Sequence, residues 1–199
     1  DLTESGPQPE ETVEGACQME LVTDPARLEQ LLTLWQDAPW VSVLALPDLQ
    51  GLAVDGVEED EVSIGAVILP DRVGADAYRH CLEVLFSDKV TKVTHQVKEL
   101  AEDLLAEGLP VDGFRFDTAL GAYLLAPTDG SYAMEKLSVK WLGFELPPAQ
   151  TFLAENAFPP LEEPTEAMTA MLRHTAAIGA LYEKMEPELE AQGLTELLN

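Results

Sequence analysis

The residues from Lys92 to Gly143 constrain the fold most, because hydrophobic periodicity and helix-ending residues follow each other there in a clear order. A short β-rich segment comes first. The apolar residues after it have the i, i+3, i+4, i+7, i+8 spacing of one buried helical stripe: Val97, Leu100, Ala101, Leu104 and Leu105. Gly108 and Pro110 are residue types that end a helix. This part of the chain therefore predicts a strand followed by an amphipathic helix.

Two further helices are predicted before Gly143. Asp117 is placed to cap the first of them, Pro127 ends it, and its apolar residues are Leu120, Tyr123 and Leu124. Ser131 can cap the second, for which Gly143 is the expected stop, and its apolar residues are Met134, Leu137 and Trp141.

An antiparallel meander is predicted before this stretch. Residues 40–46 form a short, continuous apolar and β-branched run, typical of a central strand buried on both faces. Pro47-Asp48 then turns the chain into a second strand, residues 49–54. The acidic residues 55–61 should form the tip of a hairpin that leads into a third strand, residues 62–69.

Helices should flank these strands. Asp24-Pro25 supplies a cap and a first-turn proline for a helix with the stripe Leu28, Leu31, Leu32 and Trp35. Residues 75–86 predict a second helix, and residues 90–94 a parallel strand. Residues 165–185 predict a long helix that continues after a break at Pro187. Together these elements indicate an α/β fold around one mixed sheet of about five to six strands.

The two ends and one internal segment differ from this pattern. Residues 1–18 are acidic and contain proline and glycine, so we expect a flexible linker before a domain that spans residues 19–199. A strand should begin at Met19. Residues 146–164 are rich in proline and predict an irregular loop with at most one short helix. The last residues contain no helix stop, which suggests a piece of a longer polypeptide.

The composition excludes several kinds of protein. Thirty-seven Asp and Glu against eleven Lys and Arg give a formal net charge of -26, which should repel DNA because phosphate binding depends on Lys and Arg. Cys17 and Cys81 have no metal-binding spacing, Cys81 lies on an apolar helical face, and both suit a reducing cytoplasm. No run approaches the roughly 20 apolar residues of a membrane span, so we expect a cytoplasmic protein without a membrane partner.

The order of strand, helix, Asp117-capped helix and third helix resembles the 3′–5′ exonuclease domain of bacterial DNA polymerase I, a family A polymerase. The second motif of that family has its frame here in residues 95–100, His-Gln-Val-Lys-Glu-Leu. The resemblance covers residues 19–199 and implies a ribonuclease-H-like fold. It also implies partners, namely the polymerase and 5′-nuclease domains of the same polypeptide, with DNA contacted only through that parent enzyme.

Exonucleases of this family hydrolyse phosphodiesters with two Mg²⁺ or Mn²⁺ ions held by acidic residues of three motifs. The matching positions in this sequence hold aliphatic residues: Leu44, Leu46, Leu100 and Ile178. His174 stands at the position of the family's tyrosine. The resemblance therefore implies no catalytic residues, no metal ligands and no cofactor. The short Pro47-Asp48 link is similar to that of Bacillus-type polymerases, in which the fold persists without proofreading.

Three functions remain open. The first is a vestigial, non-catalytic exonuclease domain with a structural role. The second is an active exonuclease that uses shifted carboxylates such as Asp48, Glu99 or Asp103. The third is an acidic module that binds a basic protein, for which the net charge is the sole support.

Some polar residues have simpler interpretations. Asp48 and Asp55 are typical turn residues, and Asp117 is a helix cap. His95 is interpreted as a strand-end histidine bonded to backbone, and His80 as a surface residue. The densest basic group has the spacing of a solvated face: Lys92, Lys98, Lys136 and Lys140.

Overall fold

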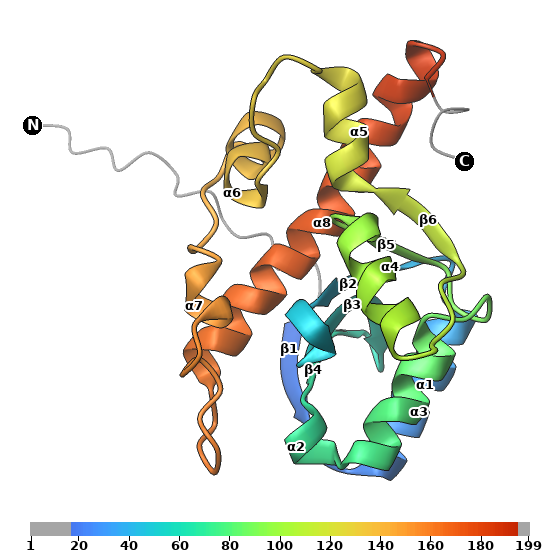
Figure 1. Ribbon diagram of the computed structural model, residues 1–199, viewed down its shortest axis with the longest axis vertical. Coiled ribbons are helices and arrows are strands. Elements are labelled where there is room, and N and C mark those ends of the chain that lie inside the picture. Colours follow the sequence, from blue (N-terminus) through green and yellow to red (C-terminus); the bar gives the residue numbers. More distant parts are fainter. Residues whose placement is uncertain (1–16, 195–199) are drawn as a thin grey trace, which may run out of the picture.

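A computed structural model of the protein describes residues 17–194 and arranges them around one six-stranded sheet (Figure 1). The strands lie in the order β1, β4, β3, β2, β5, β6. Strands β2, β3 and β4 form the predicted antiparallel meander, β1 is parallel to β4, and β5 and β6 continue parallel to β2. The bounds of the strands are β1 Cys17–Val22, β2 Val41–Ala45, β3 Leu52–Glu59, β4 Val62–Ile68, β5 Lys92–Thr94 and β6 Phe114–Asp117.

Helices cover both faces of this sheet, so the predicted α/β layout around a mixed sheet is confirmed (Figure 1). Most are short, and α8 is by far the longest. The helices and helical turns are α1 Pro25–Asp37, η1 Pro47–Leu49, α2 Pro70–Val73, α3 Ala75–Leu85, α4 Val97–Ala106, α5 Thr118–Leu125, α6 Met134–Leu137, the π-turn η2 Ser138–Leu142, α7 Gln150–Leu153 and α8 Thr165–Ala191.

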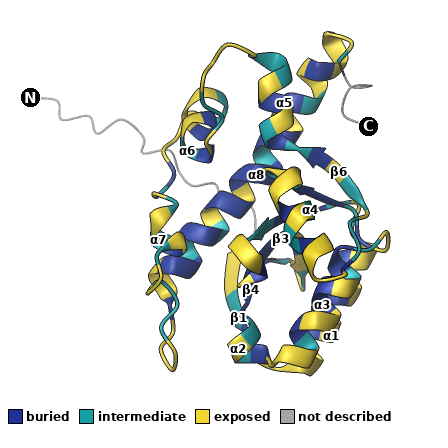
Figure 2. Ribbon diagram, in the orientation of Figure 1, coloured by how far each residue is buried: buried dark blue, intermediate teal, exposed yellow. Residues whose placement is uncertain are grey.

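Alternate residues of the central strands pack into hydrophobic clusters on opposite faces of the sheet. Because successive side chains of a strand point to opposite faces, Val43 and Val54 pack with α1, α3 and α4, while Leu44 and Ala53 pack on the α8 side. Figure 2 shows buried residues along α8 and the central strands. Helix α8 approaches the sheet closely, since a Cβ atom at Gly179 would lie 3.2 Å from the ring of Trp40.

The hairpin between β3 and β4 differs from its prediction. Strand β3 continues to Glu59, and the turn is made by Asp60 and Glu61, whose φ angles are 51° and 66°. The prediction of Asp55 as a turn residue is therefore wrong, because Asp55 pairs with Ser42 inside the sheet. Asp48 does lie in a turn, in η1, with a φ of 56°.

Helical faces were predicted less well than helix positions. Leu105 of α4 is 67% exposed, so it lies outside the predicted stripe. Helix α5 buries its small residues Gly121 and Ala122 and leaves Leu120 and Tyr123 exposed, because Gly121 packs directly against the ring of Phe116. Trp141 of the third predicted helix is half-buried, and Gly143 ends that helix as predicted, with a φ of 79°.

Helix α8 does not break at Pro187 but continues to Ala191. A proline inside a helix removes one backbone hydrogen bond, and here Met185 and Leu189 are fully buried on either side of it. The packing of these two side chains against the core offsets the lost bond. The predicted loop over residues 146–164 holds only the short helix α7, as expected.

Little is described of the N-terminal segment. The strand predicted to begin at Met19 begins at Cys17 instead. Apart from Cys17 and Gln18, the predicted linker of residues 1–18 lies outside the described residues. Within residues 17–194, no helix combines the length and the apolar character needed to cross a membrane.

Lys92 is buried, which contradicts its predicted place on a solvated face; Lys98, Lys136 and Lys140 are exposed as predicted. Its Nζ atom donates hydrogen bonds to the carbonyl oxygens of Ser87, at 2.9 Å, and Val90, at 2.7 Å. The same atom lies 5.2 Å from the ring centroid of Phe114. Lys92 is the first residue of β5, so its side chain packs between the sheet and the preceding loop and does not lie on a helix surface.

Lys92 should make the stability of the protein depend on pH. Burial lowers the pKa of Lys92 to about 8, against the opposing effect of Asp112 and Asp88. The unfolded chain then binds the proton more tightly, so the free energy of unfolding should rise from about pH 8 to about pH 10.5. The Lys92→Met variant should lack this rise, which amounts to roughly 2–3 kcal/mol.

Urea denaturation at several pH values across this range measures the difference. Lys98→Met is the matched control, because Lys98 is exposed, and its pH dependence should run parallel to that of the wild type. A Lys92→Met protein with the wild-type pH dependence would contradict the prediction.

Candidate functional site

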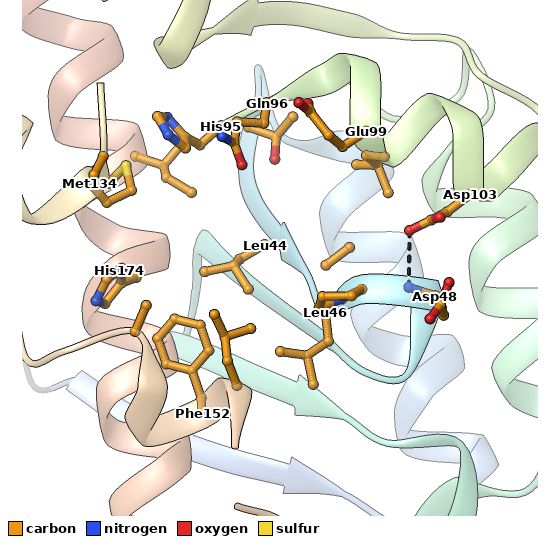
Figure 3. A pocket seen from close by; sticks show the side chains of 18 of the residues that line it. Leu44, Leu46, Asp48, His95, Gln96, Glu99, Asp103, Met134, Phe152 and His174 are labelled. Atoms are coloured by element: carbon orange, nitrogen blue, oxygen red, sulfur yellow. Dashed lines mark hydrogen bonds between the residues drawn. The ribbon is translucent and has the colours of Figure 1, made fainter. Parts of the chain in front are cut away.

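A cavity of about 550 Å³ lies at the carboxyl ends of the parallel strands β2 and β5 (Figure 3). Ligands of α/β proteins commonly bind at this edge of a sheet. Beside these strands, the walls come from η1, α4, α6, α7 and α8. The floor is apolar, with contributions from Leu44, Leu46, Leu100, Met134, Phe152 and Ile178.

The five positions singled out in the sequence all line this one cavity. Leu44 lies in β2, Leu46 follows it, Leu100 lies in α4, and His174 and Ile178 lie one turn apart in α8. Leu46 is 6% exposed, Leu100 7% and Ile178 1%. Segments far apart in the sequence therefore bring aliphatic side chains together where the resemblance places carboxylates.

His174 ties α8 to the proline-rich segment. Its Nε2 atom lies 2.7 Å from the carbonyl oxygen of Pro147, so Nε2 carries the proton and donates it. The imidazole also meets the ring of Phe152 edge-on, with centroids 4.9 Å apart. The contacts with Pro147 and Phe152 hold α7 beside the cavity, so His174 has a structural role.

His95 leaves one ring nitrogen without a partner. Its Nδ1 atom lies 2.8 Å from the hydroxyl oxygen of Thr118, so the prediction of a bond to backbone is wrong. The Thr118 hydroxyl oxygen also lies 3.4 Å from the carbonyl oxygen of Thr94, a longer contact than the one with Nδ1 of His95. The Nε2 atom of His95 is buried and makes no hydrogen bond.

This histidine is neutral at neutral pH. Burial lowers the pKa of His95 below its ordinary value, although Asp117, Glu99 and Glu135 act in the opposite direction. His95 lines the cavity, but its Nε2 atom is buried away from the open space.

Asp117 fixes the position of helix α4, which forms one wall. Its carboxylate accepts hydrogen bonds from Ala119 N, at 2.9 Å, which confirms it as the predicted cap of α5. It also accepts from the backbone of Gln96, at 2.9 Å, and of Val97, at 3.0 Å, where α4 begins. One carboxylate therefore satisfies the free N–H groups of two helices.

Most of the acidic side chains at the cavity come from two adjacent elements, η1 and α4, and one comes from α6. Those that line the cavity are Asp48, Glu99, Glu102, Asp103 and Glu135. Asp103 accepts a hydrogen bond from the backbone N–H of Asp48 at 3.0 Å, which holds the tight turn η1 against α4. In Figure 3, Asp103 and Asp48 lie on the side of the cavity opposite His174, and Glu99 lies between them and His95.

Glu135, on α6, is a site residue that the sequence did not indicate. Burial works to raise the pKa of Glu135, but hydrogen bonds from backbone N–H groups, including that of Ala149, and the nearby His174 and His95 hold that pKa below its ordinary value. Glu135 is therefore ionised at neutral pH. Its short helix gives no periodic signal, so the sequence alone did not reveal it.

Two further observations describe the chemistry of the cavity. No lysine or arginine within residues 17–194 lines it. In the same part of the chain, no three histidine, cysteine, aspartate or glutamate side chains are grouped so that they could hold a metal ion. Asp55 does not line the cavity, and burial raises the pKa of its carboxyl group in β3.

Comparison with known proteins shows partial relatives. No protein-family model matches the chain. Over 110 residues, 54% of this chain, it is 33% identical to DNA polymerase I of Mycobacterium tuberculosis and of Mycobacterium bovis. The DNA polymerase I of Mycobacterium leprae is 30% identical over 112 residues. The chain spans only 12% of the length of these relatives.

Solved structures show the same fold over most of the chain. Pol1 of Mycobacterium smegmatis, solved with DNA primer-template and dNTP, has a TM-score of 0.70 and 21% identity, covering 91% of this chain and 29% of that one. RNase D of Escherichia coli, an exoribonuclease, has a TM-score of 0.65 and 17% identity, covering 88% of this chain and 46% of that one. RNase D of Trypanosoma brucei has a TM-score of 0.65 and 14% identity, covering 87% and 66%.

These comparisons confirm the predicted ribonuclease-H-like fold, as it occurs in 3′–5′ exonucleases of the RNase D kind. Half of the chain is homologous to part of DNA polymerase I.

Proposed function

We propose that this chain is the 3′–5′ exonuclease-like domain of a family A DNA polymerase and that it is catalytically inactive, like the domain of Bacillus-type polymerases. One observation carries the proposal: the cavity at the ends of β2 and β5 has aliphatic side chains at the four positions where the resemblance expects carboxylates, namely Leu44, Leu46, Leu100 and Ile178. The homology to DNA polymerase I and the shared fold support the assignment to this enzyme.

The chemistry of phosphodiester hydrolysis explains why these residues matter. Two metal ions stabilise the attacking and the leaving oxygen, and Mg²⁺ needs several oxygen ligands that converge on it. Leu46, Leu100 and Ile178 are buried and offer none. The side chains present do not fit a two-metal centre.

The domain then has a structural role within a longer polypeptide. It packs beside the polymerase domain and spaces that domain from the 5′-nuclease, and DNA is bound by the parent enzyme rather than by this domain. Its net charge of -26 supports this division, because an acidic surface repels the phosphates of DNA. The compartment that suits such a protein is the bacterial cytoplasm.

An active exonuclease is the second candidate, and one observation favours it. Asp48, Glu99 and Asp103, the shifted carboxylates considered in the sequence, all line the cavity. However, Asp103 is engaged by the backbone N–H of Asp48, and both Glu99 and Asp103 lie on helix α4. They form one rim rather than opposing ligands, so we rank this function second. A module for a basic partner protein is the third candidate and has the charge alone in its favour.

A nuclease assay separates the first two candidates. The purified chain, incubated with a 3′-labelled single strand of DNA and Mn²⁺, should release no more nucleotide than buffer does, with or without a chelator. An RNA strand of the same sequence should also remain intact. Nucleotide release that a chelator abolishes, and that Asp103→Asn reduces at least tenfold, would favour the active exonuclease and overturn the proposal.

A buried carboxylate at position 178 should be costly, because the cavity floor has no group to pair with it. Ile178→Asp should lower the free energy of unfolding by roughly 3–5 kcal/mol near pH 8, whereas Ile178→Val should cost about 1 kcal/mol. Burial raises the pKa of such a carboxyl, so the deficit relative to Ile178→Asn should shrink as the pH falls toward 5.

Chemical denaturation of the three variants provides these values. Adding Mn²⁺ should not restore Ile178→Asp, since a single introduced carboxylate finds no converging partners. A stabilisation of Ile178→Asp that depends on Mn²⁺ and is absent from Ile178→Asn would count against the inactive-domain proposal.

A further inference from the structure

Residues 144–164, which connect η2 to α8, form one wall of the cavity and have little secondary structure; we call this segment the strap. Its one helix is α7, and its residues Ala149, Phe152 and Leu153 line the cavity. Figure 1 shows the strap, in orange, running beside α8 and then extending beyond α7 as a narrow loop. A segment with so few hydrogen bonds of its own depends on side chains from other elements to keep its place.

The start of the strap is fixed by two side chains, just before α7 begins. The Nε2 atom of His174, on α8, lies 2.7 Å from the carbonyl oxygen of Pro147. The carboxylate of Glu135, on α6, accepts a hydrogen bond from the backbone N–H of Ala149 at 3.0 Å. Residues 147–149 therefore form a fixed point about which the rest of the strap can move.

The far end of the strap is held by Arg72 of α2. Its Nη2 atom donates hydrogen bonds to the carbonyl oxygens of Pro159, at 2.7 Å, and of Glu162, at 2.8 Å. Within residues 17–194, these are the only hydrogen bonds that join residues 155–163 to a helix or strand other than α8. A charged donor between two carbonyl groups makes a strong but single attachment.

Packing does little to hold this far end. Leu161 is fully exposed, and its backbone has a φ of 68°, a conformation that few residues other than glycine adopt. A hollow of about 480 Å³ is lined by Leu161 together with Leu21 and Thr23. Phe158 is half-buried against the cluster on the α8 side of the sheet. The position of the loop therefore depends on Arg72 more than on buried apolar surface.

We infer that the strap is a lid on the cavity, which Arg72 keeps closed and which swings about residues 147–149. Phe152 is 4% exposed and belongs to the same hydrophobic cluster as Leu46, on the cavity floor. Figure 3 shows both residues along one edge of the cavity. When Arg72 releases the loop, α7 can leave α8, and Leu46 loses its cover. The lid requires neither metal ions nor nucleic acid, so it does not depend on the proposed function.

Amide hydrogen exchange of the full chain tests the role of Arg72. Arg72→Met removes the donor and keeps a long side chain. The backbone N–H groups of Phe152 and Leu153, both bonded to the carbonyl of Ala149, should then exchange roughly tenfold faster, because a four-residue helix does not persist away from α8. The N–H of Ala149, at the fixed point, and those of β2 and β3 should keep their rates.

Arg79→Met is the matched control. Arg79 also donates to a carbonyl oxygen, that of Glu107, but it lies on α3, which packs on the opposite face of the sheet. Its replacement removes the same charge and should leave the exchange of α7 unchanged.

A second measurement follows access to the cavity floor directly. In a Cys17→Ser/Leu46→Cys chain, the introduced thiol lies on the floor, and the buried Cys81 of α3 reports global unfolding. With a small maleimide, Arg72→Met should speed labelling at position 46 roughly tenfold and leave the labelling of Cys81 unchanged.

Two kinds of result would overturn the inference. Exchange of α7 and labelling at position 46 that do not respond to Arg72→Met, or that respond equally to Arg79→Met, would show that Arg72 does not hold a lid. Equal acceleration of α7, the sheet and Cys81 would show that Arg72 stabilises the whole fold instead.

Discussion

The carboxylate of Asp117 is the interaction on which the geometry of the cavity depends most. It stands at the end of β6 and accepts backbone hydrogen bonds from the beginnings of both α4 and α5. Helix α4 starts with Gln96 in a left-handed conformation, which an unpaired helix end would not readily maintain. The placement of Leu100, Glu99 and Asp103 along one wall follows from this anchor. A residue expected only to cap one helix thus positions a wall of the site as well.

Much of the fold follows from local patterns in the sequence. The stripe of α1, the apolar run of β2 and the stop at Gly143 are confirmed, because each depends on neighbouring residues alone. Asp55, Lys92 and Pro187 were misjudged for the opposite reason. Asp55 is placed by its pairing with Ser42 on the neighbouring strand. Lys92 is placed by the ring of Phe114 and by the carbonyl groups of the loop just before β5, and Pro187 by the buried neighbours Met185 and Leu189.

The candidate site could also be predicted only in part. The resemblance to a known family indicated the aliphatic positions in and just after β2, in α4 and in α8, and all of them line one cavity in the structure. The sequence did not indicate Glu135, because its place depends on the path of the short elements between Pro127 and Phe152. It did not indicate the unpaired nitrogen of His95 either, because that depends on the contact of the ring with Thr118 in α5. A pattern of residue types indicates which side chains occupy given positions of a motif. Only coordinates show which groups face the cavity.

The close approach of α8 to the sheet sets how deep the cavity can be. At Gly179 a hydrogen atom, rather than a side chain, faces the indole of Trp40, and Ile178 is its immediate neighbour in the chain. The glycine therefore lets the helix axis lie close to β2, since a Cβ atom at this position would already be 3.2 Å from the indole. Any substitution that lifts α8 would move His174 and Ile178 outward together, and the hollow would widen without a single lining residue being replaced.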